Sequence, residues 1–161
     1  MYIIDACAII NLSNCALWEV FGEHFSSKLC FQGLVEDECL SMVEQLNDLV
    51  DRWGVLRFDG SKILAREVAA IATSYSIGLG ESECLVIAIA NGYGFISDDK
   101  KARSAARTAM PNSDVIGTIG VLCKLIDSGK IGPNDATEAL NGIRLAGGHI
   151  PDFDFRRRIV C

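Results

Sequence analysis

Residues 78–107 place acidic side chains at the ends of segments that must be buried. The stretch reads GLGESECLVIAIANGYGFISDDKKARSAAR. It predicts a helix, a glycine turn, a short apolar strand at 95–96 and a second helix. The segment 84–90 is apolar on every side, so we expect this part of the helix to be buried all round. Carboxylates beside such segments cost free energy unless a partner offsets their charge.

Four acidic residues stand at these junctions. Glu81 and Glu83 fall in the first turn of the helix, and Asp98 and Asp99 directly follow the strand. One explanation is that these acids cap helices and favour the helix dipole. The other is that they act together as oxygen ligands of a divalent cation. Acids that reach the same place from other parts of the chain favour the cation.

Two such acids are found upstream. Asp5 follows the apolar strand 2–4, and open α/β sheets bind ligands outside the carboxyl ends of their strands. A long amphipathic helix predicted over 33–53 carries Glu38 on the shoulder of its apolar stripe. The alternatives are a helix cap at Asp5 and an exposed flank at Glu38.

Composition limits the class of protein. With 161 residues, half of them hydrophobic, the chain suits one domain with a substantial core. Seven cysteines without a CxxC pair indicate buried reduced thiols rather than a zinc site or disulfides. No apolar run is long enough to span a bilayer and no basic region precedes the first one, so we expect a cytoplasmic protein without membrane contact. The net charge of −6 argues against binding nucleic acid through a general positive field, but it does not exclude a metal-dependent nuclease.

Strands and helices alternate along the chain. The expected strands are 2–4, 28–32, 55–58, 95–96 and 114–116. The expected helices include 18–25, 33–53, 61–75 with Ser61 as its cap, and one that ends near 145. This alternation predicts an α/β fold, a three-layer α/β/α sandwich with a mostly parallel central sheet. We expect one domain over 1–148, with 149–161 as a C-terminal tail packed on it or extending it.

The acids and the basic residues after them suggest phosphodiester chemistry. The acids that can converge at one sheet edge are Asp5, Glu38, Glu83 and Asp98. Such a set suits Mg²⁺ or Mn²⁺, which activate water and stabilise the charge of an attack on a phosphodiester. Lys100, Lys101 and Arg103 can hold a phosphate backbone across the site, although a solvated helix face is the alternative. No GxxxxGK[ST] loop or serine triad suggests a different chemistry.

Several segments, taken in order, resemble a PIN-domain protein. They read IIDACAIINL, LVEDECL, GLGESECLVIAIANGYGFISDDKKAR and VIGTIGVL with LIDSGKI, over about residues 2–131. The resemblance is closest to the branch with a G-x-G-E-x-E helix motif, a D-D/E-K-K-x-R motif and a G-T-x-G turn. It implies a three-layer α/β/α fold and Mg²⁺- or Mn²⁺-dependent ribonuclease activity. Many members are VapC-type toxins held inactive by an antitoxin, and a homodimer is expected at the family level.

The resemblance also implies roles for individual residues. It places metal-binding acids at Asp5, Glu38, Glu83 and Asp98, with Glu81 and Asp99 as alternates. Because Glu81 and Glu83 lie two residues apart on a helix, only one is expected to reach the metal. Ala6 and Cys7 stand where Thr-Ser or Thr-Asn usually follows the first aspartate. This difference removes a hydroxyl that orients metal-bound water.

Three functions compete on this sequence. The first is a metal-dependent endoribonuclease, the toxin of a toxin–antitoxin pair, with RNA and an antitoxin as partners. The second is a PIN-like module that binds RNA or protein without cleaving it. The third is a receiver-like signalling domain. That domain needs an acidic pair after its first strand, whereas Ile4-Asp5-Ala6 offers a single acid.

Overall fold

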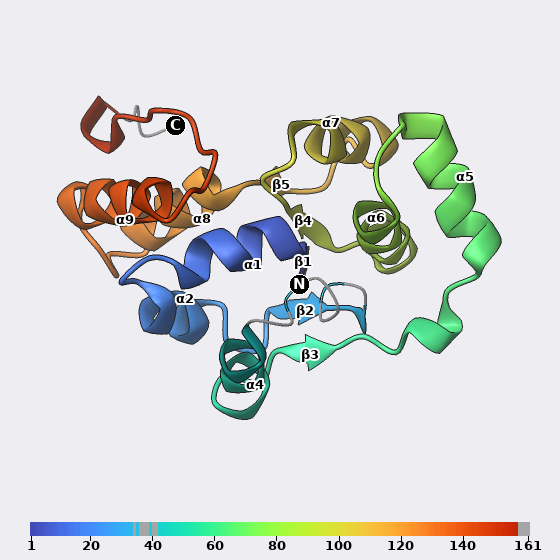
Figure 1. Ribbon diagram of the computed structural model, residues 1–161, viewed down its shortest axis with the longest axis horizontal. Helices are drawn as coiled ribbons and strands as arrows, with labels where there is room; N and C mark the ends of the chain where they lie inside the picture. Colours follow the sequence, from blue (N-terminus) through green and yellow to red (C-terminus); the bar gives the residue numbers. More distant parts are fainter. Residues whose placement is uncertain (34, 36–38, 40–41, 158–161) are drawn as a thin grey trace.

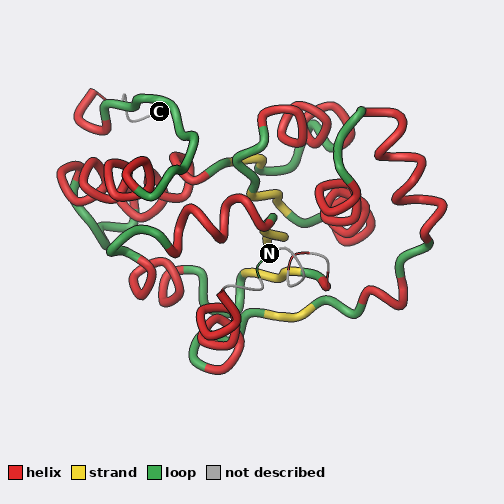
Figure 2. The backbone as a smooth tube through the Cα atoms, viewed as in Figure 1, coloured by secondary structure: helices red, strands yellow, loops and turns green. Residues whose placement is uncertain are grey.

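A parallel β-sheet runs through the middle of the molecule (Figures 1 and 2). The computed structural model describes residues 1–33, 35, 39 and 42–157. Over these residues the sheet has five strands in the order β3-β2-β1-β4-β5, all parallel. The strands are β1 (Tyr2–Ile4), β2 (Leu29–Phe31), β3 (Leu56–Arg57), β4 (Gly94–Ile96) and β5 (Val115–Ile116). The predicted α/β class and parallel sheet are confirmed.

Helices cover both faces of the sheet, which gives the predicted three layers (Figure 1). On one side, α1 (Ala6–Ser13), α2 (Trp18–His24) and α8 (Thr118–Asp127) contact one another, and α9 (Pro133–Leu145) packs on α8. On the other side, α5 (Ala65–Tyr75), α6 (Leu79–Asn91) and α7 (Lys100–Ala109) contact one another. The short helix α4 (Val43–Asp51) precedes β3, and a 3₁₀ turn, η2 (Gly60–Lys62), follows it.

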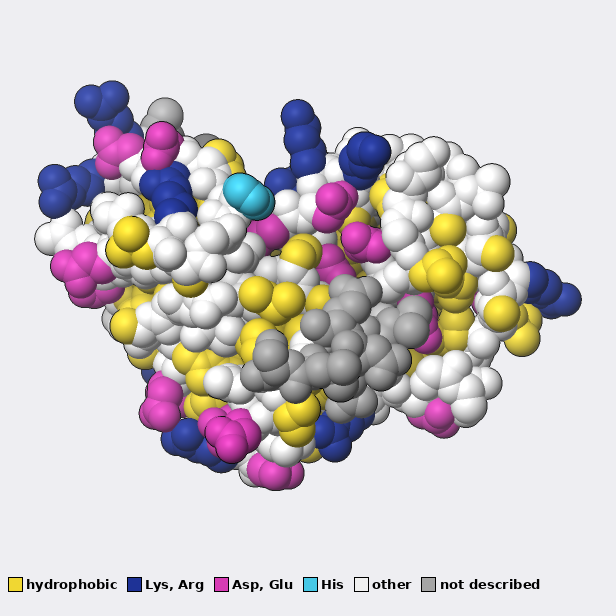
Figure 3. Space-filling model, viewed as in Figure 1, with side chains coloured by type: hydrophobic (Ala, Val, Ile, Leu, Met, Phe, Trp, Pro, Cys, Tyr) yellow, Lys and Arg dark blue, Asp and Glu magenta, His cyan; other side chains and the backbone are white. Residues whose placement is uncertain are grey.

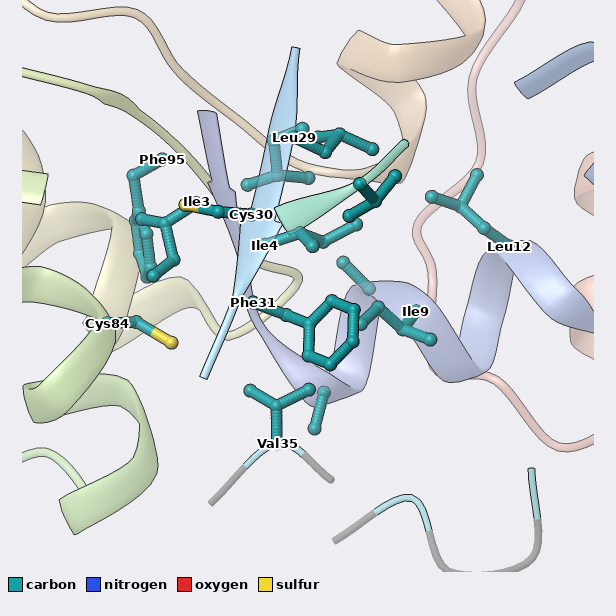
Figure 4. Close-up of a cluster of buried hydrophobic side chains, with 14 of the residues drawn as sticks. Ile3, Ile4, Ile9, Leu12, Leu29, Cys30, Phe31, Val35, Cys84 and Phe95 are labelled. Atoms are coloured by element: carbon teal, nitrogen blue, oxygen red, sulfur yellow. The ribbon is translucent and has the colours of Figure 1, made fainter. Parts of the chain in front are cut away.

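The core is built on the central strand β1 and its two neighbours, β2 and β4 (Figure 4). Ile3, Ile4 and Phe95 are fully buried, as expected for strands covered on both faces. Burying a large apolar side chain contributes on the order of 1.5–3 kcal/mol, so this layer supplies much of the stability. A second buried cluster joins α8 and α9 to the C-terminal segment through Ile150 and Phe155. Two side chains of the C-terminal segment, Ile150 and Phe155, are therefore buried against these helices.

Two predicted helices differ in extent. The helix predicted over 33–53 is not continuous, because Cys39 lies in a turn and Met42 has a non-helical φ of −128°, so that α4 begins at Val43. The prediction that Ser61 caps a helix over 61–75 was also wrong. Asp59 accepts the Ser61 amide and caps η2, and α5 begins only at Ala65.

Two predictions of burial were too generous. The segment 84–90 is not buried all round, because Ile89 is 44% exposed where neighbouring helices cover only part of α6. The apolar face predicted for the helix over 61–75 is also incomplete, since no residue of α5 is fully buried and Leu64 before it is 46% exposed. Both differences lie in the layer formed by α5, α6 and α7.

The cysteines of the described part of the chain are free thiols, as predicted. Cys15, Cys30, Cys39 and Cys84 are buried, and Cys7 and Cys123 are partly exposed. Within the same part of the chain, no helix combines the length and the apolar character needed to cross a membrane.

The contact between α2 and Trp53, two residues after α4, gives a test of the packing. A Cβ at Gly22 would lie 2.3 Å from ring atoms of Trp53, which is itself buried. We expect Gly22→Ala to lower the free energy of unfolding by about 1–3 kcal/mol, the usual cost of overpacking. Urea unfolding followed by tryptophan fluorescence measures this. The control is Gly33→Ala, where the Cβ meets nothing within 4 Å. Equal stabilities of the two variants would contradict the prediction.

Candidate active site

The carboxyl ends of β1 and β4 bring Asp5 and Asp98 to one edge of the sheet. Ile4 pairs with Ile96 in register, and the ladder continues one residue further, where the Asp5 amide donates to the Ile96 carbonyl at 2.9 Å. Ser97 Oγ then donates to Asp5 Oδ2 at 2.8 Å. Hydrogen bonds thus join the residues that follow β1 and β4, at the edge where parallel sheets bind ligands.

Asp5 is a buried carboxylate held by three donors. Its Oδ1 accepts the Ala6 amide at 2.9 Å, which makes it the cap of α1, and its Oδ2 accepts Cys7 Sγ at 2.9 Å and Ser97 Oγ. Burial raises the pKa of Asp5, and the nearby charge of Glu81 adds to this, against the lowering effect of the Cys7 and Ser97 hydrogen bonds. Asp5 therefore caps a helix and is also buried within reach of the charge of Glu81.

Cys7 connects the two aspartates. Its thiol donates to Asp5, and its sulfur accepts the backbone amide of Asp98 at 3.2 Å. Burial and the charge of Asp5 raise the pKa of Cys7 to about 12, so the thiol stays protonated at neutral pH. Cys7 thus supplies a hydrogen bond to Asp5, but a thiol is a weaker donor than a hydroxyl.

Asp98 contacts residues of three helices. Its Oδ1 accepts the Thr118 amide at 2.8 Å, and its Oδ2 accepts the Thr118 hydroxyl and Asn11 Nδ2, the latter at 2.8 Å. Arg103 Nη1 lies 4.0 Å from Oδ1. Asp99 behaves differently, because its Oδ1 accepts the Ala102 amide and caps α7. The cap explanation therefore applies to Asp99, while Asp98 joins α1, α7 and α8.

An open cavity of about 420 Å³ lies beside these residues. Figure 3 shows acidic side chains and a histidine gathered around a hollow on this face. Glu81, Asp98 and Asp99 line the cavity, together with Cys7, Asn11 and His149. Three acids, one from α6 and two that follow β4, thus line one open space.

Glu81 and Glu83, the two acids near the start of α6, lie in different surroundings. Glu81 lines the acidic cavity, and its carboxylate bends back so that a Cβ on Gly78 would lie 2.3 Å from Oε2. Glu83 lines a separate hollow beside Gly60, where its Oε2 is buried and has no hydrogen-bond partner among the described residues. Burial raises the pKa of Glu83. The structure therefore brings the alternate, Glu81, to Asp98, and it does not bring Glu83 there.

The other predicted residues are distributed as follows. Glu38 lies outside the described residues. Arg103 reaches the acids, whereas Lys101 lines a hollow beside Tyr75. Lys100 is exposed at the start of α7. Of the three predicted cations, the structure thus places Arg103 beside Asp98.

The side chains of this site offer carboxylate oxygens, the type of ligand that a hard divalent cation binds. Asp5, Glu81 and Asp98 offer carboxylate oxygens, and Oδ1 of Asp5 and of Asp98 each accept a single hydrogen bond and so keep a second lone pair. As the described side chains stand, no three His, Cys, Asp or Glu groups are arranged to hold a metal ion together.

Sequence reasoning did not assign a role to four residues of this site. Ser97 and Thr118 lie inside the quoted motifs, so their position beside the acids was a usable signal. Asn11 follows Cys7 by four residues, and a polar side chain on that face of an apolar helix was a second signal. His149 had none, because only the packing of the C-terminal segment brings it to the cavity.

Comparison with known proteins agrees with this architecture. The family model DUF3368, described as a PIN domain, matches residues 1–159. No curated protein and no solved structure was found to match the chain. The family match spans the sheet, both aspartates and the segment that carries His149. The chain therefore belongs to the PIN-domain family, and this family is part of a superfamily of nuclease-type proteins.

Proposed function

We propose that this protein is a Mg²⁺- or Mn²⁺-dependent endoribonuclease. The observation that carries the proposal is that Glu81 and Asp98 line one cavity beside the buried Asp5, on which the charge of Glu81 acts, and that Arg103 lies 4.0 Å from Asp98. Such a concentration of carboxylates is costly without a cation. The chemistry that a divalent ion supplies when bound is activation of water and stabilisation of charge on a phosphodiester under attack.

The residues around the acids have positioning roles in this proposal. Cys7 and Ser97 fix the carboxylate of Asp5, and Asn11 and Thr118 fix that of Asp98. Hydrogen bonds of this kind orient ligating side chains and tune their affinity for metal. Asp98 and Asp5 are therefore presented in set orientations, and Glu81 would be the third carboxylate to hold an ion. Glu38 remains a predicted ligand from the resemblance.

RNA is the proposed substrate, on the basis of the resemblance and of Arg103 beside the acids. An arginine can bind a phosphate oxygen of the strand while the carboxylates hold the metal. We extend the proposal to the role of a toxin, with an antitoxin that blocks the acidic cavity and with a homodimer as the assembly. A cytoplasmic location is supported by the free thiols of the described cysteines.

A module that binds RNA or protein without cleavage is the second candidate. It is favoured by the present side-chain arrangement, in which no three potential ligands of the described chain are placed to share an ion. This candidate is also favoured by the thiol of Cys7, which stands where PIN-domain proteins usually have a serine or an asparagine. RNA binding that is insensitive to chelators, without cleavage, would support this candidate.

Asparagine at position 5 or 98 tests the shared carboxylate site. Asn keeps an oxygen acceptor but loses the charge, so Asp5→Asn and Asp98→Asn should fold and should lose Mn²⁺ binding in calorimetry. RNA cleavage should fall by about 100-fold or more, beyond the roughly 10–100-fold effect of outer-shell changes. EDTA should abolish cleavage by the wild type. The control is Asp51→Asn on the exposed end of α4. No Mn²⁺ binding by the wild type, with RNA present, would refute the proposal.

The two acids of α6 give a paired test. Glu81→Gln should weaken Mn²⁺ binding and cleavage by about tenfold or more, because Glu81 lines the cavity with Asp98. Glu83→Gln should leave both unchanged, because Glu83 lines a different hollow. The opposite ranking, measured by calorimetry and by cleavage of a labelled RNA, would restore Glu83 as the ligand.

Glu83 also predicts a dependence of stability on pH. Because burial raises its pKa, the folded state keeps this proton to higher pH than the unfolded chain does. The contribution of Glu83 to the free energy of unfolding therefore falls as the pH rises through the ordinary carboxyl range. Glu83→Gln should show a shallower loss of stability over this range, measured by urea unfolding at several pH values. Identical slopes would show that Glu83 is not buried in solution.

A further inference from the structure

A smaller cavity adjoins the acidic one. It has a volume of about 170 Å³ and shares Asp98 and His149 with its larger neighbour. Its remaining lining residues are Arg103, Gly117, Ile119, Ile150 and Pro151. Asp98, a proposed metal ligand, and His149 therefore lie at the border between the two cavities.

The smaller cavity combines apolar walls with a cation. Ile119, Ile150 and Pro151 present aliphatic surface, and Arg103 brings a guanidinium to the border with Asp98. Gly117 contributes to the space, because a Cβ there would lie 2.6 Å from Asp98 Oδ1 and 3.1 Å from Arg103 Nη1. A nucleotide has matching parts, since its base and sugar offer apolar faces and its phosphate is anionic.

Arg103 retains the capacity to bind a phosphate. Its Nη1 donates to the Ser97 carbonyl at 2.7 Å, which fixes the position of the guanidinium. The guanidinium has five N–H donors, so others remain for a ligand in the cavity. Its side chain is 22% exposed, which agrees with a group placed in a wall rather than extended into solvent.

His149 is held at the border by an anchored segment. The chain turns at Gly147, with a φ of +92°, and passes so close to α1 that a Cβ on Gly148 would lie 2.6 Å from Asn11 Oδ1. Arg144 Nε donates to the Ile150 carbonyl at 3.1 Å, and the Ile150 side chain is buried in the second cluster. The residues on both sides of His149 are thus fixed, and the imidazole is presented to both cavities.

We propose that the smaller cavity binds the nucleotide next to the scissile phosphate of a single RNA strand, with His149 contacting the strand between the two cavities. This inference rests on the proposed function, which places the scissile phosphate at Asp5 and Asp98. In this arrangement Arg103 contacts the flanking phosphate, and the aliphatic wall of Ile119, Ile150 and Pro151 covers the base or sugar. His149 is a substrate-binding residue and takes no part in holding the metal.

The test is a titration of the ¹⁵N-labelled protein with adenosine 5′-monophosphate in MgCl₂, followed by NMR. The nucleotide should shift the amide signals of Gly117, Ile119 and His149 and should bind more tightly than inorganic phosphate, because the base adds contacts. His149→Ala should weaken this binding about tenfold, within the usual range for one base-stacking contact. It should raise KM for RNA cleavage by a similar factor, while kcat and Mn²⁺ binding stay unchanged. His24→Ala on α2, which removes the other histidine, is the matched control and should change none of these.

Each result decides between the two proposals. Shifts confined to other surfaces, equal binding of phosphate and nucleotide, or an unchanged KM in His149→Ala would overturn the nucleotide site, even if the protein cleaves RNA. Nucleotide binding at the three amides without RNA cleavage or Mn²⁺ binding would support the site and overturn the nuclease.

Discussion

The pairing of β1 with β4 is the interaction on which the site depends. Its register places the residues after both strands side by side, and the hydrogen bond from the Asp5 amide to the Ile96 carbonyl extends the ladder to the first acid. The strands themselves are buried on both faces, so their ends cannot move apart without exposing the core. The acidic edge therefore gains its rigidity from apolar packing beneath it.

The charges of the site oppose the folding that creates it. Asp5 is buried beside the charge of Glu81, and burial raises its pKa even though three donors hold the carboxylate. A chain selected for stability alone would gain by replacing one of these acids with an apolar or amide side chain. Retaining them is understandable if a cation or a substrate bound to a cation offsets the charge, which is the chemistry expected of the PIN-domain family.

Sequence reasoning succeeded where strand order and register determine the outcome. Asp5 and Asp98 follow buried strands, and any parallel pairing of these strands brings them to one edge. It preferred Glu83 to Glu81, whereas the structure places Glu81 on the acidic cavity, because the rotation of α6 about its axis is fixed by contacts with α5 and α7. The prediction of one continuous helix over 33–53 was wrong because the apolar stripe continues through residues where the backbone is not helical. His149 depends on the turn at Gly147, which no local pattern connects with the acids.

The packing of residues 147–155 on α8 and α9 has a consequence during protein synthesis. The acidic cavity lacks one wall until Ile150 and Phe155 have entered the second cluster, and α8, which holds Asp98 through Thr118, belongs to the same cluster. A nascent chain on the ribosome would therefore carry its aspartates without a finished site until nearly the whole domain had emerged. Such an order of assembly would separate translation of the protein from the onset of any activity toward nearby RNA.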